Sequence, residues 1–347
     1  MPISALSKHS FEPIQCCPPS LGADLRRREF ISLLGGAAAW PLAARAQQTA
    51  RSLRVGFVGV QPRDAPIYVA FRKRTADLGY REGKYFTFEY IQTPSIDAYD
   101  ASFRELVSRK PDIVIAAGNE PALRAARAAA GTLPIVFLAI DFDPVARGYV
   151  AGLARPGGNI TGIFVHPLEL AAKRVELVRE SFPQARQLGL LWDASSRDQV
   201  EAATTTAKSL DFEPRPIEVT GEPPDYAAAF GQMADVPGEP VVIPAGPIFL
   251  RDRTTIARLL LERRIPSITA FREIVESGAM MSYGIDLVGL FRDLAGVVDE
   301  IAKGAKPAEL PILQSSRFYL AINLKSAGAL GVTLPVAFTA RADEVIE

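Results

Sequence analysis

Short apolar runs alternate with amphipathic segments along most of the chain, and this alternation constrains the fold more than any other feature. In the first half, apolar runs of strand length separated by segments of helical periodicity occupy 53–60, 66–80, 85–92, 96–110, 112–118, 120–131 and 134–140 in turn. Strands that alternate with helices over short connections predict a parallel sheet with helices on both faces. We therefore expect an α/β lobe built as β-α-β-α-β-α-β.

The same alternation resumes after a glycine-rich turn. The stretch "RPGGNITGIFV" at 155–165 is typical of a turn followed by a strand, and we place the crossing between two lobes there. The predicted fold class is α/β, with two doubly wound parallel-sheet lobes joined by a hinge. We expect residues 51–162 with about 285–306 in the N-terminal lobe, and residues 163–284 with about 307–347 in the C-terminal lobe.

The segment before residue 47 has the pattern of an export signal. Three arginines at 26–28 precede an apolar stretch of about 15 residues, and Ala44-Arg45-Ala46 has the A-x-A form of a cleavage site. A membrane-spanning helix needs about 20 apolar residues, so this stretch is too short. The run "RREFI" at 27–31 resembles a twin-arginine signal. We expect residues 1–46 to direct export and to be cleaved after Ala46, leaving a soluble protein in the periplasm.

Composition argues against several classes of function. The 39 basic and 39 acidic residues balance, and no basic stripe indicates nucleic-acid binding. The only cysteines, Cys16 and Cys17, precede the expected cleavage site, and His166 is the only histidine after it. Thiolate catalysis, Ser-His-Asp catalysis and zinc sites all draw on these residue types. We therefore expect no enzymatic activity, no metal and no cofactor.

Three stretches carry a resemblance to a known family. They are "PIVFLAIDFDPVARGYVAGLARPGGNITG" (134–162), "FREIVESGAMMSYGIDL" (271–287) and "INLKSAGALGVTLPVAFTARADEVIE" (322–347). Together they resemble the ABC-transporter substrate-binding family whose characterised members bind tryptophan or tyrosine, which are type I periplasmic binding proteins. The resemblance implies a monomeric receptor that closes around a small solute and delivers it to an ABC permease at the inner membrane. A His-Pro pair often follows the first strand in this family; here the loop is "QPRDAP" (61–66).

Candidate ligand contacts follow from the rule that ligands bind at the carboxyl ends of strands in such sheets. The residues at these positions are Gln61, Arg63, Gly118, Asn119, Asp141, Phe142, Trp192, Gly246, Phe249, Phe271, Tyr283 and Asp286. Amide groups at the helix start after Asn119 favour a carboxylate, and the aromatic residues suit a ring. We expect an aromatic amino acid, an aromatic acid or a related carboxylate as the ligand.

Structural roles compete with these assignments. Asn119 and Asp143 are also placed to cap helices, Trp192 to pack in a core, and Arg63 to lie on a solvated surface. Two other functions also fit the predicted fold, because such sheets host many chemistries. One is a ligand-sensing domain for a signalling partner, and the other is an exported α/β enzyme.

Overall fold

A computed structural model describes residues 52–347 except 234 and 236–237. Ser52–Glu347 form one compact unit. The expected export signal at 1–46 lies outside the described residues. Within the unit, the strands form two separate sheets, and each sheet with its helices is called a lobe below.

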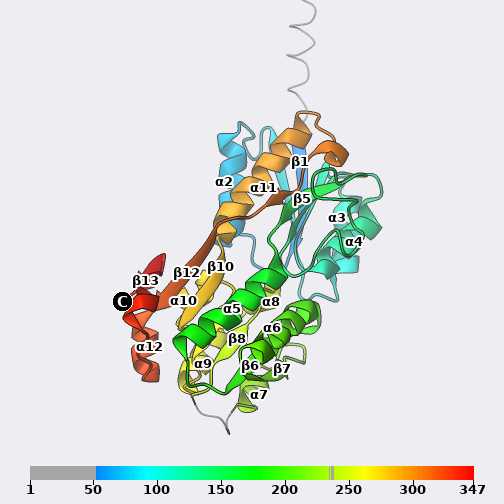
Figure 1. Cartoon of the computed structure of the whole chain (residues 1–347). Coiled ribbons are helices and arrows are strands. Elements are labelled where there is room, and N and C mark those ends of the chain that lie inside the picture. The colour runs from blue at the N-terminus through cyan, green and yellow to red at the C-terminus, as the bar shows by residue number, and fades with distance from the viewer. Residues whose placement is uncertain (1–51, 234, 236–237) are drawn as a thin grey trace, which may run out of the picture. The chain divides into compact units, whose positions relative to one another are not determined.

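The first lobe contains a six-stranded sheet in the order β11-β5-β4-β3-β1-β2. Its strands are β1 (Leu53–Gly59), β2 (Phe86–Gln92), β3 (Ile113–Gly118), β4 (Ile135–Ala139), β5 (Ile160–Phe164) and β11 (Leu313–Gln314), all paired in parallel. Helices α2 (Pro66–Asp77) and α11 (Leu287–Ala302) pack together on one face, and α3 (Tyr99–Ser108) and α4 (Glu120–Ala130) on the other (Figure 1). This arrangement confirms the predicted α/β class.

The second lobe contains a seven-stranded sheet in the order β13-β12-β10-β9-β8-β6-β7. Its strands are β6 (Gln187–Trp192), β7 (Glu213–Glu218), β8 (Val241–Ile243), β9 (Ser267–Thr269), β10 (Met281–Ile285), β12 (Phe318–Asn323) and β13 (Glu344–Ile346). Helices α5 (Pro167–Ser181) and α6 (Arg197–Ser209) cover one face, and α7 (Tyr226–Gly231), α9 (Arg253–Glu262) and α10 (Arg272–Glu276) the other. The short helix α8 (Pro247–Arg251) follows β8.

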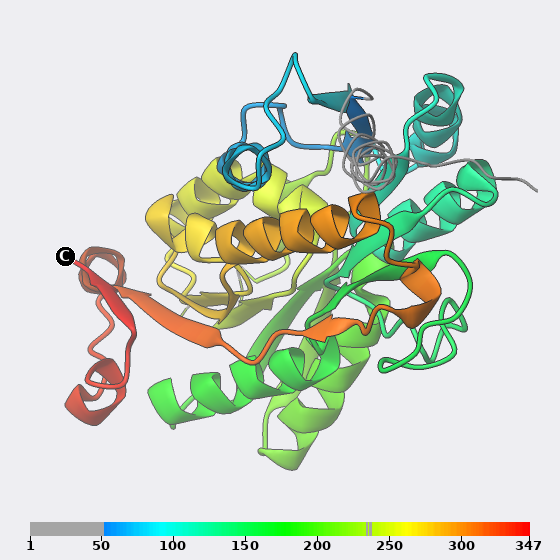
Figure 2. The ribbon, with the colours of Figure 1, turned by 90° about the horizontal axis from the view of Figure 1, so that it is seen from above.

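The second sheet is not entirely parallel. β12 runs antiparallel to β10, and it leads the chain to α12 (Leu324–Leu330), α13 (Val336–Thr339) and β13 at one end of the sheet (Figure 2). An antiparallel strand at the margin of a parallel sheet is common in doubly wound folds. The parallel prediction therefore holds for β6–β10 and not for β12.

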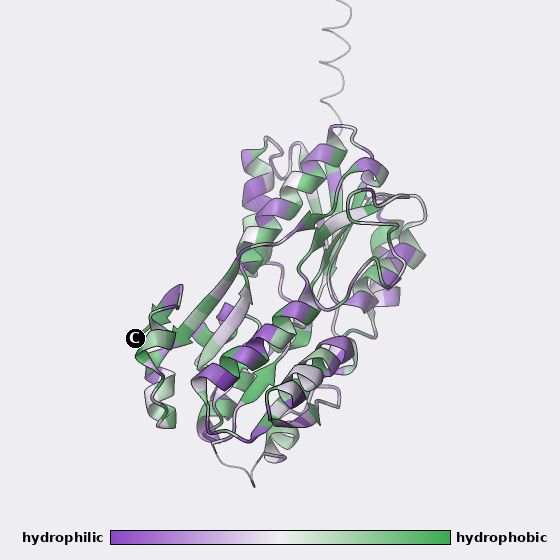
Figure 3. Ribbon diagram, viewed as in Figure 1, coloured by the Kyte–Doolittle hydropathy of each residue, from purple (hydrophilic) through white to green (hydrophobic). Residues whose placement is uncertain are grey.

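Burial on both faces explains why the central strands are apolar along their whole length. Every residue of β4 and β5 is buried, and much of the strand surface in the two sheets is coloured as hydrophobic in Figure 3. A strand covered by helices on both sides has no solvent face, so it lacks the polar alternation of an exposed sheet.

The chain crosses between the lobes three times. The first crossing joins β5 to α5, and the second joins β10 to α11, which returns to pack on α2 in the first lobe. The third joins β11, which pairs with β5, to β12 in the second lobe. The segment 307–347 therefore contributes to both sheets. The first crossing follows residue 164, two residues beyond the expected boundary at 162.

Candidate ligand-binding site

An apolar cavity of about 40 Å³ lies between the carboxyl ends of the two sheets and is called the inner cavity below. The first lobe contributes the loop after β1, the end of β3, and Tyr68 of α2. The second lobe contributes Pro247 and Phe271, and Leu287 and Phe291 of α11 complete the wall. No charged side chain lines it, so the inner cavity suits a hydrocarbon or aromatic group.

Tyr68 lies in the wall of this cavity, and Tyr90 packs against it with the ring centroids 5.1 Å apart. The Tyr90 hydroxyl donates to the carbonyl of Gly59 at 3.1 Å and also contacts the carbonyl of Gln61. A Cβ at Gly59 would lie 2.3 Å from the Tyr68 hydroxyl oxygen, so only glycine permits this approach. Burial and the neighbouring Tyr90 raise the pKa of Tyr68, and burial raises the pKa of Tyr90 to about 12. These phenols are therefore neutral near pH 7.

Two buried polar residues that directly follow lining residues of the inner cavity, Gly118 and Ile140, each have a side-chain atom without a partner. Asn119 and Asp141 are both 1% exposed and follow the paired strands β3 and β4. Asn119 Oδ1 accepts from the backbone N–H of Ala122 at 3.3 Å, which leaves Nδ2 as a free donor. Asp141 Oδ1 accepts from the N–H of Glu120 at 3.0 Å, which leaves Oδ2 as a free acceptor. Such atoms are costly to bury unless something binds them.

The electrostatics at Asp141 disfavour a second negative charge. Burial raises the pKa of Asp141 well above its ordinary value, and the carboxylate of Asp193 in the second lobe raises it further. Asp193 already accepts hydrogen bonds from the backbone N–H and the hydroxyl of Ser196 at 3.0 and 2.7 Å. A cationic ligand group between the two carboxylates would relieve this repulsion.

The start of α4 differs from the expected anion site. The N–H of Glu120 is bound by Asp141, residue 121 is a proline without an N–H, and the N–H of Ala122 is bound by Asn119. The helix dipole still favours negative charge there, but Asp141 already supplies it. The expectation that these amides await a ligand carboxylate is therefore not supported by the geometry.

A larger polar cavity of about 530 Å³ lies next to the inner one and also spans both lobes. Tyr99 lines both cavities, and its phenol is kept neutral by burial, with Asp141 raising its pKa further. This larger cavity is called the outer cavity below. It is lined by acidic, basic and hydroxyl side chains, including Asp97, Arg124, Ser195 and Arg251. A ligand in the inner cavity therefore has polar surroundings on the side of Tyr99.

The lobes touch directly around these cavities. Gln61 Nε2 in the first lobe donates to the carbonyl of Pro247 in the second at 3.3 Å. Arg147 Nη2 lies 2.6 Å from Asp198 Oδ2, and Arg251 Nη1 donates to the carbonyl of Pro94 at 3.4 Å. These contacts bridge the cleft, which explains why the inner cavity is far smaller than a typical site for an organic ligand.

Comparison with known proteins gives this geometry a context. The family model described as ABC transporter substrate binding protein matches residues 62–346. The chain belongs to this family. A tyrosine-binding protein of Clostridioides difficile is 26% identical over 269 residues, which is 75% of each chain. An L-Trp complex from Streptococcus pneumonia shares the fold with 24% identity and a TM-score of 0.76, covering 85% of this chain and 100% of that one. A conserved domain protein from Vibrio cholerae gives 23% identity and a TM-score of 0.77 over the same shares.

Three of the predicted contacts of this substrate-binding protein line the inner cavity, and two more follow lining residues in the chain. Gln61, Gly118 and Phe271 are in the lining, whereas Asn119 and Asp141 directly follow the lining residues Gly118 and Ile140 and are not themselves in it. Gly118 has a φ of +123°, and a Cβ there would lie 3.0 Å from Pro247 Cγ across the cleft. Glycine is therefore needed both for the backbone conformation and for the contact between lobes.

Four predicted contacts are held elsewhere by packing or by surface pairing. Arg63 is exposed and pairs with Glu82 at 2.5 Å. Phe142 is buried on the α3–α4 face of the first sheet, with its ring 5.8 Å from that of Tyr149. Trp192 packs against the hydrophobic core between the second sheet and helices α5 and α6, with Arg197 4.9 Å from its ring. Phe249 is fully buried beside Tyr226. Only some of the side chains at strand ends face the cleft, and the side chains of these four residues do not line it.

Three predicted contacts in the second lobe have structural roles. Gly246 precedes α8, and a Cβ there would lie 2.9 Å from Phe249 Cδ2. The Tyr283 ring packs 6.2 Å from that of Phe318. Asp286 caps α11 by accepting from the N–H of Gly289 at 2.9 Å. Asp143 likewise caps a turn through the N–H groups of Val145 and Ala146, as the alternative predicted.

Several cavity residues were not predicted from the sequence. Tyr68 and Tyr99 lie in the first turns of α2 and α3, over the carboxyl edge of the first sheet. Leu287 and Phe291 lie four residues apart and therefore on one face of α11. Aromatic residues in the first turn of a helix that follows a strand would have been the signal for the two tyrosines.

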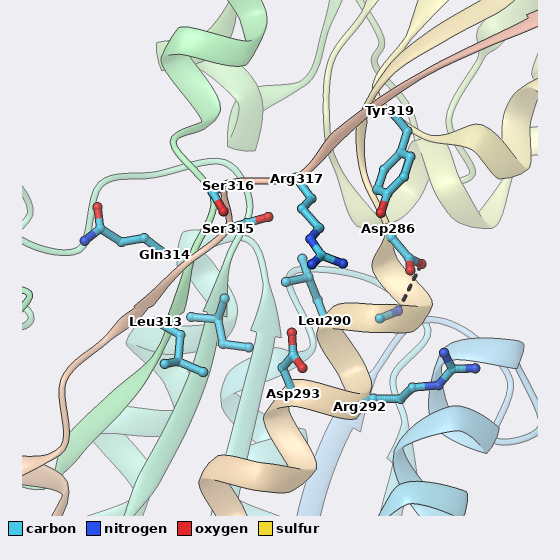
Figure 4. A pocket seen from close by; sticks show the side chains of 12 residues that line it. Asp286, Leu290, Arg292, Asp293, Leu313, Gln314, Ser315, Ser316, Arg317 and Tyr319 are labelled. Atoms are coloured by element: carbon cyan, nitrogen blue, oxygen red, sulfur yellow. Dashed lines mark hydrogen bonds between the residues drawn. The ribbon is translucent and has the colours of Figure 1, made fainter. Parts of the chain in front are cut away.

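A third cavity, of about 520 Å³, lies beside the second and third crossings (Figure 4). The Arg317 side chain points toward α11 and the Tyr319 hydroxyl toward Asp286, while Arg292 points away. Among the described residues, none of the buried unpartnered side-chain atoms belongs to its lining. Because its charged groups are solvated, this cavity makes a weaker ligand site than the cleft, although it is large.

In the described part of the chain, none of the helices combines the length and the apolar character that crossing a membrane requires. No group of three or more His, Cys, Asp or Glu side chains in residues 52–347, apart from the undescribed positions 234, 236 and 237, is arranged to hold a metal ion.

Proposed function

We propose that this substrate-binding protein captures an aromatic amino acid between its lobes for an ABC importer. The observation that carries the proposal is the pair of unpartnered atoms at Asn119 and Asp141, which directly follow the lining residues Gly118 and Ile140 of the inner cavity. The ligand ammonium would donate to Asp141 Oδ2, and one carboxylate oxygen would accept from Asn119 Nδ2. The ring would enter the inner cavity between Tyr68, Phe271 and Phe291, where aromatic packing adds to burial.

Two relatives support this class of ligand. One is called a tyrosine-binding protein, and a solved structure with the same fold contains L-Trp. An inner cavity of about 40 Å³ is too small for an aromatic ring, so the lobes must separate before the ligand enters. The three crossings form the hinge for that motion. On closure the surface pair Arg147–Asp198 re-forms, while the inner cavity stays wide enough to hold the ring.

The proposal is tested by a thermal-shift and calorimetric screen of purified residues 47–347. We expect L-Trp, L-Tyr or L-Phe to raise the melting temperature by mass action, and the corresponding acids without the amine to bind far more weakly. Asp141→Asn should weaken binding by about 10- to 100-fold, because it removes a charge-assisted hydrogen bond of roughly 1.5–3 kcal/mol.

Asp143→Asn is the matched control, since it alters a carboxylate in the same loop that caps a turn. It should leave the dissociation constant within about twofold of the wild type. Equal affinity for benzoate-like acids, or an unchanged affinity in Asp141→Asn, would contradict the proposed site.

We also propose that the protein acts in the periplasm, as a monomer, after export through residues 1–46. The sequence pattern of that region supports export, and the family supports an ABC transporter as partner. Expression of the whole chain in a Gram-negative host, followed by mass spectrometry of the periplasmic fraction, should show a chain that begins at Gln47. Retention of the uncleaved chain in the cytoplasm would refute the export proposal.

A further inference from the structure

Arg174 of α5 is a buried cation without a carboxylate partner. It is 1% exposed and is the largest of the fully buried side chains. Its Nε donates to the carbonyl of Tyr283 at 2.9 Å, and its Nη1 is buried without any partner. Across the described residues, no Asp or Glu forms an ion pair with it. An uncompensated buried charge costs several kcal/mol, so a negative charge from outside the chain is expected beside this cation.

The guanidinium lines a small cavity inside the second lobe, of about 10 Å³. The other lining residues come from α5, α6, β6 and the end of β8, and they are Ala171, Leu190, Leu191, Gln199, Val200, Ala203, Val242 and Pro244. All of these except Gln199 are apolar. Gln199 has no free group, because it donates to the carbonyl of Ala245 at 2.8 Å and accepts from its N–H at 3.0 Å.

The side chains that line this cavity therefore offer a hydrogen-bond donor and a positive charge, but no free acceptor. A buried water molecule needs two to four polar partners, and among these side chains only Arg174 has a free group to give it. A monatomic anion needs no acceptor, is compact although larger than water, and is attracted by the guanidinium in a region of low dielectric, which offsets the cost of its dehydration. The positive charge persists at neutral pH, since burial lowers the pKa of Arg174 only to about 9.

We propose that a single halide ion, chloride in ordinary media, binds in this cavity against Arg174 and stabilises the second lobe. The site is separate from the inner and outer cavities of the cleft, which share no lining residue with it. The ion holds α5 against the sheet by neutralising the cation that points from the helix into the core.

The first test needs no variant. Crystals of the wild-type protein grown in bromide are expected to show an anomalous peak beside Arg174 Nη1. In solution, chloride replacing gluconate at constant ionic strength up to about 0.2 M should raise the melting temperature by about 2–4 °C and then saturate. Gluconate is too large for the cavity, so it serves as the inert anion.

Two variants separate this site from general salt effects. Arg174→Met replaces the cation with an unbranched apolar side chain. This variant should fold, because buried charges replaced by hydrophobic residues are often tolerated. It should lose both the chloride response and the bromide peak. Lys173→Met removes the neighbouring positive charge, which pairs with Glu176 at the surface, and should keep both.

Three results would overturn the proposal. The first is the absence of bromide density at Arg174. The second is an equal chloride response in Arg174→Met and the wild type. The third is a loss of amino-acid binding in Arg174→Met without any chloride effect, which would assign the arginine to the ligand site.

Discussion

At the residue scale, the proposed ligand site depends on buried polar atoms that have no hydrogen-bond partner within the protein. Asp141 illustrates this, since one oxygen caps α4 and the other is buried with no donor. The structure tolerates this arrangement because a proton can neutralise the carboxyl, and burial raises the pKa of Asp141 accordingly. A ligand ammonium would take over the role of that proton.

This situation predicts a pH dependence of the ligand-free protein. Because the pKa of Asp141 is raised on folding, the folded chain holds a proton that the unfolded chain releases. Its contribution to the free energy of unfolding is therefore complete below the ordinary pKa of about 3.9 and is lost as the pH rises through the raised pKa. Asp141→Asn removes this loss, so its melting temperature relative to the wild type should increase as the pH rises from about 4.

Calorimetry of both proteins without ligand, at fixed ionic strength, measures the difference. Asp143→Asn makes the same change of side chain in a residue of the same loop that caps a turn, and it is the matched control. Parallel curves for the wild type and Asp141→Asn would show that Asp141 is not buried as described.

At the element scale, most helices and strands were predictable, whereas the choice of cleft residues was less so. The pattern of "DIVIAAG" and "EPALRAARAAAG" predicted β3 and α4 because strand and helix periods differ and a capping Asn119 separates them. The antiparallel β12 was not predicted, since "RFYLAIN" is apolar in either direction. Periodicity specifies which residues are buried, but it does not specify strand direction.

The same limit applies to side chains at strand ends. Phe271 and Phe249 both follow strands of the second sheet and both are fully buried, yet only Phe271 lines the inner cavity. Their difference arises from the packing of α8 and Tyr226, which links segments distant in sequence. The surroundings of Asn119 and Asp141 were easier to predict. A buried polar side chain at the end of a strand needs a hydrogen-bond partner, which a helix start or a ligand in the cleft can supply.

At the scale of the whole described unit, the two lobes meet through a few polar contacts. The ion pair between Arg147 and Asp198 is the shortest of them, and its side chains are 42% and 32% exposed. Pairs exposed to this degree contribute about 0.2–1 kcal/mol, and salt screens them. Such a contact can bias closure without locking the lobes together.

Asp198→Asn should therefore weaken ligand binding by up to about fivefold, and the effect should shrink at high salt. Glu201→Gln is the matched control, since it removes an exposed carboxylate from the same helix, α6, and should leave affinity unchanged. The measurement is isothermal titration calorimetry at two ionic strengths. A salt-independent loss of affinity, or equal losses in both variants, would argue against a role for this ion pair in closure.

The cap that Asp141 places on α4 has a consequence for selectivity. Inorganic phosphate and sulfate are present in most aqueous surroundings and readily settle on vacant helix starts. Here the chain brings its own negative group to that position, so the start of α4 offers these ions no free amide at Glu120 or Ala122. Mineral anions are thus disfavoured at this helix start before any solute arrives.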